Sequence, residues 1–361
     1  MCGTSATADR LLLVHEARLT ADDLLGECLR LPLEKAISLG SARGFDRAVA
    51  LLAARLRQGA GRADADAVRD ALDVLDVDWT STTAPQRRKL IAEAISAAGK
   101  ATALIPARIE ASLGDAAESV VAATRSETRR RQGLAIGARF NALDRRVIDH
   151  VVSSQGNFVR DEYGQRVDSF GEKARRIVAD GLEQGLGRDE IAADLERAAR
   201  GALIEQSPFY WEVIASSFIG QGRSFAQMSS YAEAGIERYV IHAILDEATT
   251  PICRYLDGKE FGVGDALDRF ERVEGMDDPE DIKRVLPWVR EEADPETGRT
   301  LLYVERGGSR IALADATSTG VGRADDRGAF RSLANDEVLR EAGVLFPPYH
   351  GFCRTTTLAV V

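Results

Sequence analysis

The stretch SYAEAGIERYVIHAILD, residues 230–246, decides the fold, because its hydrophobic periodicity changes partway along. Upstream, Trp211, Phe218 and Phe225 recur at intervals of seven residues, which places them on one face of a helix. Gly235 fits a left-handed helix cap. After it the residues alternate, as in a strand, between Tyr239, Ile241, Ala243, Leu245 and Val240, His242, Ile244, Asp246. The sequence therefore predicts a change from helices to strands at this point.

Upstream of this boundary we predict helices over residues 8–60 and 64–125, separated by Gly and Pro residues. EKARRIVADGLEQGL, residues 172–186, has the spacing of an amphipathic helix that ends at Gly185 and Gly187. A second helix is expected from Arg188 to Ala202, and Pro208 suits the first turn of a third. Residues 158–167, which turn near Tyr163 and Gly164, are predicted to form a hairpin.

Downstream, residues 301–305 and 309–313 flank Arg306-Gly307-Gly308 and predict a second hairpin. Residues 355–361 are β-branched enough for a closing strand, and the acidic segment 262–300 is predicted to be an elaborated loop with a short helix. We therefore predict an α+β fold with three regions. Residues 1–130 are helical, 131–235 form a helical stem with the hairpin, and 236–361 form a small α+β domain with a short antiparallel sheet.

Composition narrows the classes of partner. The chain of 361 residues is 45% hydrophobic and carries a net charge of -10, which argues against a surface coated with nucleic acid. The densest basic run, residues 125–131, is expected to be a solvated helix face or linker, with contact to DNA or a portal as the alternative. LLLV at residues 11–14 is too short for a signal or a membrane span, so no membrane is expected. The four cysteines, Cys2, Cys28, Cys253 and Cys353, lack the spacing of a secreted disulfide framework and indicate a reducing cytosol.

Two short motifs stand out near the carboxyl end: LDEATTPICRYLDGKEF, residues 245–261, and FPPYHGFCRTTT, residues 346–357. Together they resemble the paired signature of the Mu F-like minor head proteins of tailed phages. In that signature an Asp-led strand runs into a Thr, a Cys and a Leu-Asp-Gly turn, and a Pro-Pro-x-His-x-x-Cys-Arg segment closes the domain. The matching positions here are Asp246, Thr250, Cys253, Asp257, Gly258, Lys259, Pro347, Pro348, His350, Cys353 and Arg354. The upstream stretches 177–201 and 230–241 also resemble the helical stem of that family.

The resemblance covers about residues 172–361 and implies a role in phage head morphogenesis. It implies a minor capsid protein at the portal vertex, inside the virion and, during assembly, in the host cytoplasm. Its partners would be the portal protein and capsid or scaffold protein, with an influence on DNA packaging or delivery and contact with packaged DNA. The acidic, Ala-rich first half favours protein partners, contacted through helices lying in grooves. No Walker loop, dinucleotide-binding glycine motif or His-Glu-x-x-His motif occurs, so ATP-driven packaging is expected to reside elsewhere.

Read from the residues alone, Cys253, His350 and Cys353 are the ligand types of a tetrahedral zinc site. Many relatives in the resembled family have a Cys-x-x-Cys pair at the first position, whereas Thr250 stands here, so a fourth ligand would have to be His242 or Asp246. The plainer interpretation has no cofactor: two small buried thiols, and a histidine bonded to backbone. A Cys253–Cys353 disulfide is a third interpretation, suited to an extracellular virion.

Other positions in the motifs have simple structural explanations. Asp257-Gly258 is a tight-turn signal, and Pro347-Pro348 stiffens the approach to the last strand. Arg254 and Arg354 are expected to pair with Asp246 or Asp257 and so hold the two motifs together. An enzyme, either a nuclease or a toxin-like transferase, is the alternative function, with Cys253, His350 and Asp246 as nucleophile, base and carboxylate. We predict a structural protein, because no family-specific catalytic motif surrounds Cys253.

Overall fold

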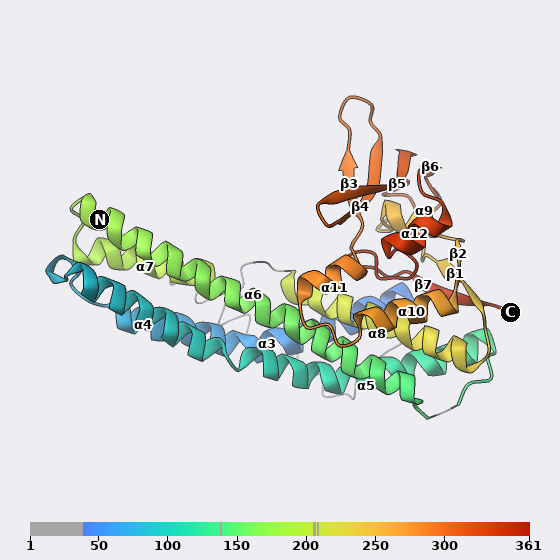
Figure 1. The fold of residues 1–361 in the computed structure, drawn as a ribbon, viewed down its shortest axis with the longest axis horizontal. Coiled ribbons are helices and arrows are strands. Elements are labelled where there is room, and N and C mark those ends of the chain that lie inside the picture. Colours follow the sequence, from blue (N-terminus) through green and yellow to red (C-terminus); the bar gives the residue numbers. More distant parts are fainter. Residues whose placement is uncertain (1–38, 138, 205–206, 208) are drawn as a thin grey trace. The chain divides into compact units, whose positions relative to one another are not determined.

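The computed structural model describes residues 39–137, 139–204, 207 and 209–361. The chain divides into two compact units, each built from separate stretches. Among the described residues, unit 1 consists of 53–112 and 156–211, and unit 2 of 39–52, 113–155 and 212–361. This division differs from the three consecutive regions that the sequence suggested. The predicted class is confirmed: long helices precede a small region of antiparallel sheet (Figure 1).

Long helices occupy most of the chain before residue 235, and shorter ones lie among the strands after it (Figure 1). The long helices are α3 (Ala42–Leu75), α4 (Ala84–Thr102), α5 (Ile105–Gln132), α6 (Ala142–Glu183), α7 (Arg188–Leu203) and α8 (Tyr210–Glu233), with the 3-10 turn η1 (Trp79–Ser81). The short helices are α9 (Pro251–Leu256), α10 (Val263–Val273), α11 (Pro279–Val285) and α12 (Asp336–Ala342). Gly235, just after α8, has φ of +70°, as predicted for a left-handed cap.

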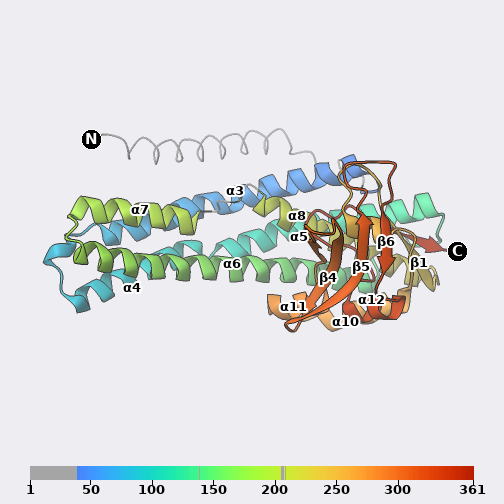
Figure 2. The same cartoon turned by 90° about the horizontal axis from the view of Figure 1, so that it is seen from above.

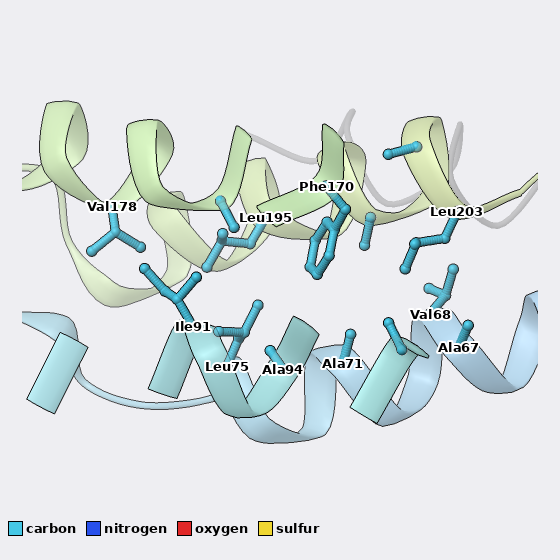
Figure 3. Packing of buried hydrophobic residues seen from close by; sticks show 14 of the residues in the cluster. Ala67, Val68, Ala71, Leu75, Ile91, Ala94, Phe170, Val178, Leu195 and Leu203 are labelled. Carbon is cyan, nitrogen blue, oxygen red and sulfur yellow. The ribbon is translucent and has the colours of Figure 1, made fainter. Parts of the chain in front are cut away.

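The core of unit 1 is a seam of small and aliphatic side chains (Figure 3). Alanines such as Ala71 and Ala94 let the helices approach closely, and Phe170 and Trp79 fill the remaining volume with no exposed surface. One polar pair lies in the same unit, where the Tyr163 hydroxyl donates to Asp64 Oδ1 at 2.9 Å. Within residues 84–132 one stretch is apolar and long enough to cross a membrane by composition, and the core helix of a soluble protein meets the same criterion.

The strands of unit 2 form two antiparallel sheets. The first has the order β2-β1-β7, with β1 (Arg238–His242) between β2 (Glu260–Gly262) and β7 (Thr356–Val360). The second has the order β3-β4-β5-β6, and Figure 2 shows β4, β5 and β6 side by side. Its strands are β3 (Arg290–Ala293), β4 (Thr300–Arg306), β5 (Ser309–Ser318) and β6 (Ala329–Ser332). The predicted β4–β5 hairpin is confirmed, and Gly307 and Gly308 supply the positive φ that its tight turn requires.

Several sequence predictions are wrong. Residues 158–167 are part of α6 and not a hairpin. The buried positions Val159, Tyr163, Arg166, Phe170 and Ala174 recur at helical spacing, which outweighs the turn tendency of the exposed Gly164. Glycines 59 and 61 do not end a helix, because α3 continues through them. Segment 262–300 holds two helices and a strand, more order than one short helix in a loop. The predictions for residues 8–38 and Pro208 lie outside the described residues.

The basic run at residues 125–131 divides between two environments, so the prediction of a solvated face holds for only part of it. Arg125 is 4% exposed, and its guanidinium forms ion pairs with Asp144 at 2.8 Å and Glu233 at 2.7 Å. Buried cations need such partners, because an unpaired charge in the interior is costly. Arg129, Arg130 and Arg131 are exposed in the last turn of α5, where positive charge is favourable to the helix dipole.

Candidate metal centre

Pairing of β1 with β7 brings the two motifs together. The strands are antiparallel, and His242 at the end of β1 lies opposite Thr356 at the start of β7. The chain that leaves β1 and the chain that enters β7 therefore meet at the same end of the sheet. Residues 245–261 and 346–357, separated by about a hundred positions, are neighbours in space for this reason.

The cysteines and the histidine converge where the motifs meet. Cys253 lies on α9, whose six residues are all buried, and Thr250 is the N-cap of that helix. The sulfurs of Cys253 and Cys353 are 3.7 Å apart, and Cys253 Sγ is 3.3 Å from His350 Nε2. The Thr250 hydroxyl lies 3.0 Å from the same nitrogen. The ligand atoms of Cys253, His350 and Cys353 all lie within 4.8 Å of one another.

The loop between β7 and the Pro-Pro pair orients His350. The Cys353 backbone N–H donates to the His350 carbonyl at 3.3 Å, so residues 350–353 form a turn that points both side chains the same way. The Phe352 backbone N–H donates to Nδ1 at 3.4 Å, and Nε2 is the nitrogen that faces the sulfurs. His350 is half-buried, whereas Cys253 and Cys353 are 2% and 0% exposed.

The pKa values of the two thiols shift in opposite directions. Burial disfavours ionisation of Cys353, but hydrogen bonds from Cys253 and His350 outweigh it and hold the pKa of the Cys353 thiol well below its usual value. The same hydrogen bond to Cys353, together with burial, raises the pKa of the Cys253 thiol. The pKa of the Cys353 thiol therefore lies below that of the Cys253 thiol. Both cysteines are free.

Asp246 joins the motifs through Arg354, as the sequence predicted. Asp246 Oδ1 accepts a hydrogen bond of 2.6 Å from Arg354 Nη2. Partial burial acts to raise the pKa of Asp246, but its hydrogen bonds from Arg354 and Thr249 lower it overall. Thr249 closes a turn with Asp246, because the Thr249 hydroxyl accepts from the Asp246 backbone N–H at 2.8 Å. The carboxylate thus fixes both the start of the first motif and the end of the second.

Arg254 pairs with no carboxylate among the described residues, so that part of the prediction is wrong. Its guanidinium is 4% exposed and donates to backbone carbonyls of Thr249 at 3.0 Å, Asp246 at 2.6 Å and Arg323 at 2.8 Å, and also to that of Asp326. A guanidinium presents donors in several directions and can satisfy several carbonyls at once. Arg254 therefore joins the loop after β1 to the loop between β5 and β6.

The remaining motif residues have structural contacts. Asp257 accepts from the Ala243 backbone N–H at 3.0 Å and pairs with Arg327 at 3.2 Å. Gly258 has φ of +83°, which explains the need for glycine in this turn. Lys259 lies 3.3 Å from Asp336 and over the Tyr255 ring. The peptide bond between Pro347 and Pro348 is cis.

Sequence reasoning missed Arg223, which lies on α8 in the stretch SFIGQGRSFAQM. Its side chain is 2% exposed and donates to the carbonyls of Leu39 at 3.1 Å, Arg354 at 3.1 Å and Thr355 at 2.5 Å. Among the described residues no carboxylate is within ion-pair distance of it. Burial lowers the pKa of Arg223 to about 10, against the opposing effects of the negative charges of Cys353 and Glu127. A lone arginine in an apolar helix was the signal that could have identified it.

The structure does not bring all the predicted ligands together. His242 is exposed on β1 and lines a cavity of about 110 Å³ with Arg131 and Gln132, away from the thiols. Asp246 is engaged by Arg354, and neither residue belongs to the group of converging ligand atoms. In the part of the chain that the structure describes, the group of ligand atoms therefore contains neither residue predicted as the fourth zinc ligand.

Comparisons with protein-family models, with curated proteins and with solved structures find no match to this chain.

Proposed function

We propose that this protein is a minor, portal-associated component of a phage head that acts in head assembly and in DNA packaging or delivery. One observation supports the proposal most. The two motifs that resemble the Mu F-like signature are in contact, through the 3.7 Å approach of Cys253 to Cys353 and the 2.6 Å bond between Arg354 and Asp246. A chance likeness of two short segments would give no reason for them to share one site.

The remainder of the molecule is consistent with an assembly role. Most charged residues of the helices α3 to α7 keep exposure to solvent, and these helices offer long surfaces to partner helices. The net charge of -10 favours portal, capsid or scaffold protein over DNA as the main partner. In this proposal the helices bind partners, and the sheets with the motif site form the domain that defines the family.

The test is to follow the tagged full-length chain in a phage lysate. Procapsids and virions are separated by sedimentation, and their proteins are identified by mass spectrometry. We expect the chain in procapsids, in fewer copies than the major capsid protein, and co-purified with portal when the tag is captured. A tagged acidic protein of similar size, with no phage role, controls for trapping inside the head. Absence of the chain from both particles would reject the proposal.

An enzyme is the second candidate, because a thiol lies 3.3 Å from an imidazole nitrogen. The observations weigh against it in two ways. Both sulfurs are buried from any large substrate, and the thiol whose pKa is lowered is that of Cys353, whereas the sequence had suggested Cys253 as nucleophile. Alkylation of the native chain by iodoacetamide distinguishes the two functions. We expect slow reaction at both cysteines, and rapid labelling of Cys353 in the folded chain would favour the enzyme.

A further inference from the structure

The cluster of Cys253, His350 and Cys353 has the donor atoms that zinc binds in proteins. Two sulfurs and one imidazole nitrogen lie within 4.8 Å of one another, and the hydroxyl of Thr250 is 3.0 Å from that nitrogen. Thiolate and imidazole are borderline-soft ligands, which suit Zn²⁺ and do not suit Mg²⁺ or Ca²⁺. The donor types therefore favour zinc over magnesium or calcium.

Two of the distances between donor atoms match the edges of a zinc tetrahedron, and the third pair, Cys353 and His350, lies within 4.8 Å. With Zn–S of about 2.3 Å, Zn–N of about 2.0 Å and tetrahedral angles, two sulfur ligands lie about 3.8 Å apart and a sulfur and a nitrogen about 3.5 Å apart. The corresponding distances here are 3.7 Å between the sulfurs and 3.3 Å from Cys253 Sγ to His350 Nε2. A disulfide would require about 2.05 Å between the sulfurs. The donors thus stand at ligand spacing.

We propose that Cys253 Sγ, His350 Nε2 and Cys353 Sγ bind one Zn²⁺, with a water molecule in the fourth position beside Thr250. The site is assembled by the fold, since α9 holds Cys253 and the 350–353 turn holds the other two ligands. Zinc binding releases any thiol protons of Cys253 and Cys353 to solvent, so that both sulfurs coordinate as thiolates, and the imidazole proton of His350 resides on Nδ1, which then gives up the 3.4 Å contact with the Phe352 N–H. No redox step is involved.

The backbone next to the site is held by Arg223. The Arg223 guanidinium is bound to the carbonyls of Arg354 and Thr355, the two residues that follow Cys353, and its Nε has no hydrogen-bond partner among the described atoms. By holding the backbone that directly follows Cys353, Arg223 is a positioning residue for the site.

The experiment measures metal in the full-length chain, purified with a tag that contains no histidine. Elemental analysis is expected to find about one zinc per chain, and the content should fall to background in Cys253→Ser, Cys353→Ser and His350→Gln. His242→Gln is the matched control, because that histidine is exposed and outside the cluster, and it should retain zinc. Circular dichroism of each variant separates loss of metal from loss of fold.

Two further measurements keep the proposal testable if the serine variants fail to fold. Cobalt substitution of the unmutated chain should give a thiolate-to-metal charge-transfer band in the near ultraviolet and the intense visible bands of a tetrahedral ion. Thr250→Cys should place a third sulfur at the open position and slow the loss of zinc to a chelator, whereas Thr250→Ser should leave that rate unchanged.

The zinc proposal is overturned if the unmutated chain holds no metal above the background of the cysteine variants and takes up no cobalt. It is also overturned if peptide mapping of the freshly isolated chain finds Cys253 joined to Cys353. Neither result bears on the head-assembly proposal, which is tested by incorporation into particles.

Discussion

The core of unit 1 and the motif site of unit 2 are both buried, but they are stabilised in different ways. The first consists of alanines and aliphatic side chains around Phe170 and Trp79, whose contacts depend on volume and shape. The second consists of cysteine, histidine and arginine side chains, each with named hydrogen-bond partners. Conservative changes should therefore be tolerated in the core of unit 1 and harmful in the motif site, because a buried polar group that loses its partner is costly.

The largest effect is expected from a substitution that disrupts the apolar core of unit 1. Phe170→Ala removes a side chain with no exposed surface and leaves a cavity, which should lower the free energy of unfolding by about 4 kcal/mol. Phe170→Leu retains much of the volume and should cost less than half as much. Urea unfolding monitored by circular dichroism measures both. Equal losses for the two variants would contradict a core governed by volume.

The next largest effect is expected from a substitution in the polar motif site of unit 2. Arg254→Ala leaves four buried or half-buried carbonyls without their donor and should cost about 3 kcal/mol. Arg254→Lys retains the charge but not the fork of donors, so it should recover less than half of the loss. The same denaturation assay applies. Full recovery by lysine would show that charge alone matters here, and the contrast with unit 1 would disappear.

Asp64 is a buried carboxyl group in unit 1, and its titration links the stability of that unit to pH. Burial raises the pKa of Asp64 from 3.8 to about 7, against the opposing effect of its hydrogen bond from Tyr163. The folded chain therefore binds this proton more tightly than the unfolded chain, and stability is lost as pH rises between those two values. We expect a loss of about 2 kcal/mol from pH 5 to pH 8 from this group.

Asp64→Asn retains an acceptor for Tyr163 and should remove this part of the pH dependence, making the chain more stable at pH 8 than the unmutated protein. Asp73→Asn, an exposed position on the same helix, is the control and should leave the pH profile unchanged. Thermal unfolding across the pH range provides the measurement. A profile that Asp64→Asn leaves unaltered would assign the titration to another group.

The smallest expected effect concerns the ion pair between the motifs. A double-mutant cycle with Asp246→Asn and Arg354→Gln should give a coupling energy of about 1 kcal/mol, because both side chains keep some exposure to solvent. The coupling should weaken at high salt. A coupling of zero at low salt would mean that the 2.6 Å contact adds nothing to the joining of the motifs.

Elements with a clear hydrophobic periodicity or turn motif could be predicted from the sequence. The β4–β5 hairpin, the start of α7 at Arg188, the strand after Gly235 and the Asp246–Arg354 pair were all predicted. The prediction of a hairpin at 158–167 was wrong. Gly164 is a local turn signal, whereas the helical spacing of the buried residues of α6 is apparent only over a longer stretch.

The partners of the site arginines were beyond reach of the sequence for a different reason. Arg254 and Arg223 donate to backbone carbonyls. Every residue has a carbonyl, so the sequence does not show which one accepts, whereas an aspartate can be identified by its residue type. Pairing by opposite charge could therefore find Arg354 but not these two.

The central claim, that residues about a hundred positions apart form one site, is tested most directly by disulfide trapping. The full-length chain is stripped of metal, treated with diamide, blocked with an alkylating agent and mapped by mass spectrometry. We predict a single dominant cross-linked pair of peptides that contains Cys253 and Cys353, whose sulfurs are 3.7 Å apart. Cross-links of either residue to Cys2 or Cys28, in place of this pair, would contradict the account.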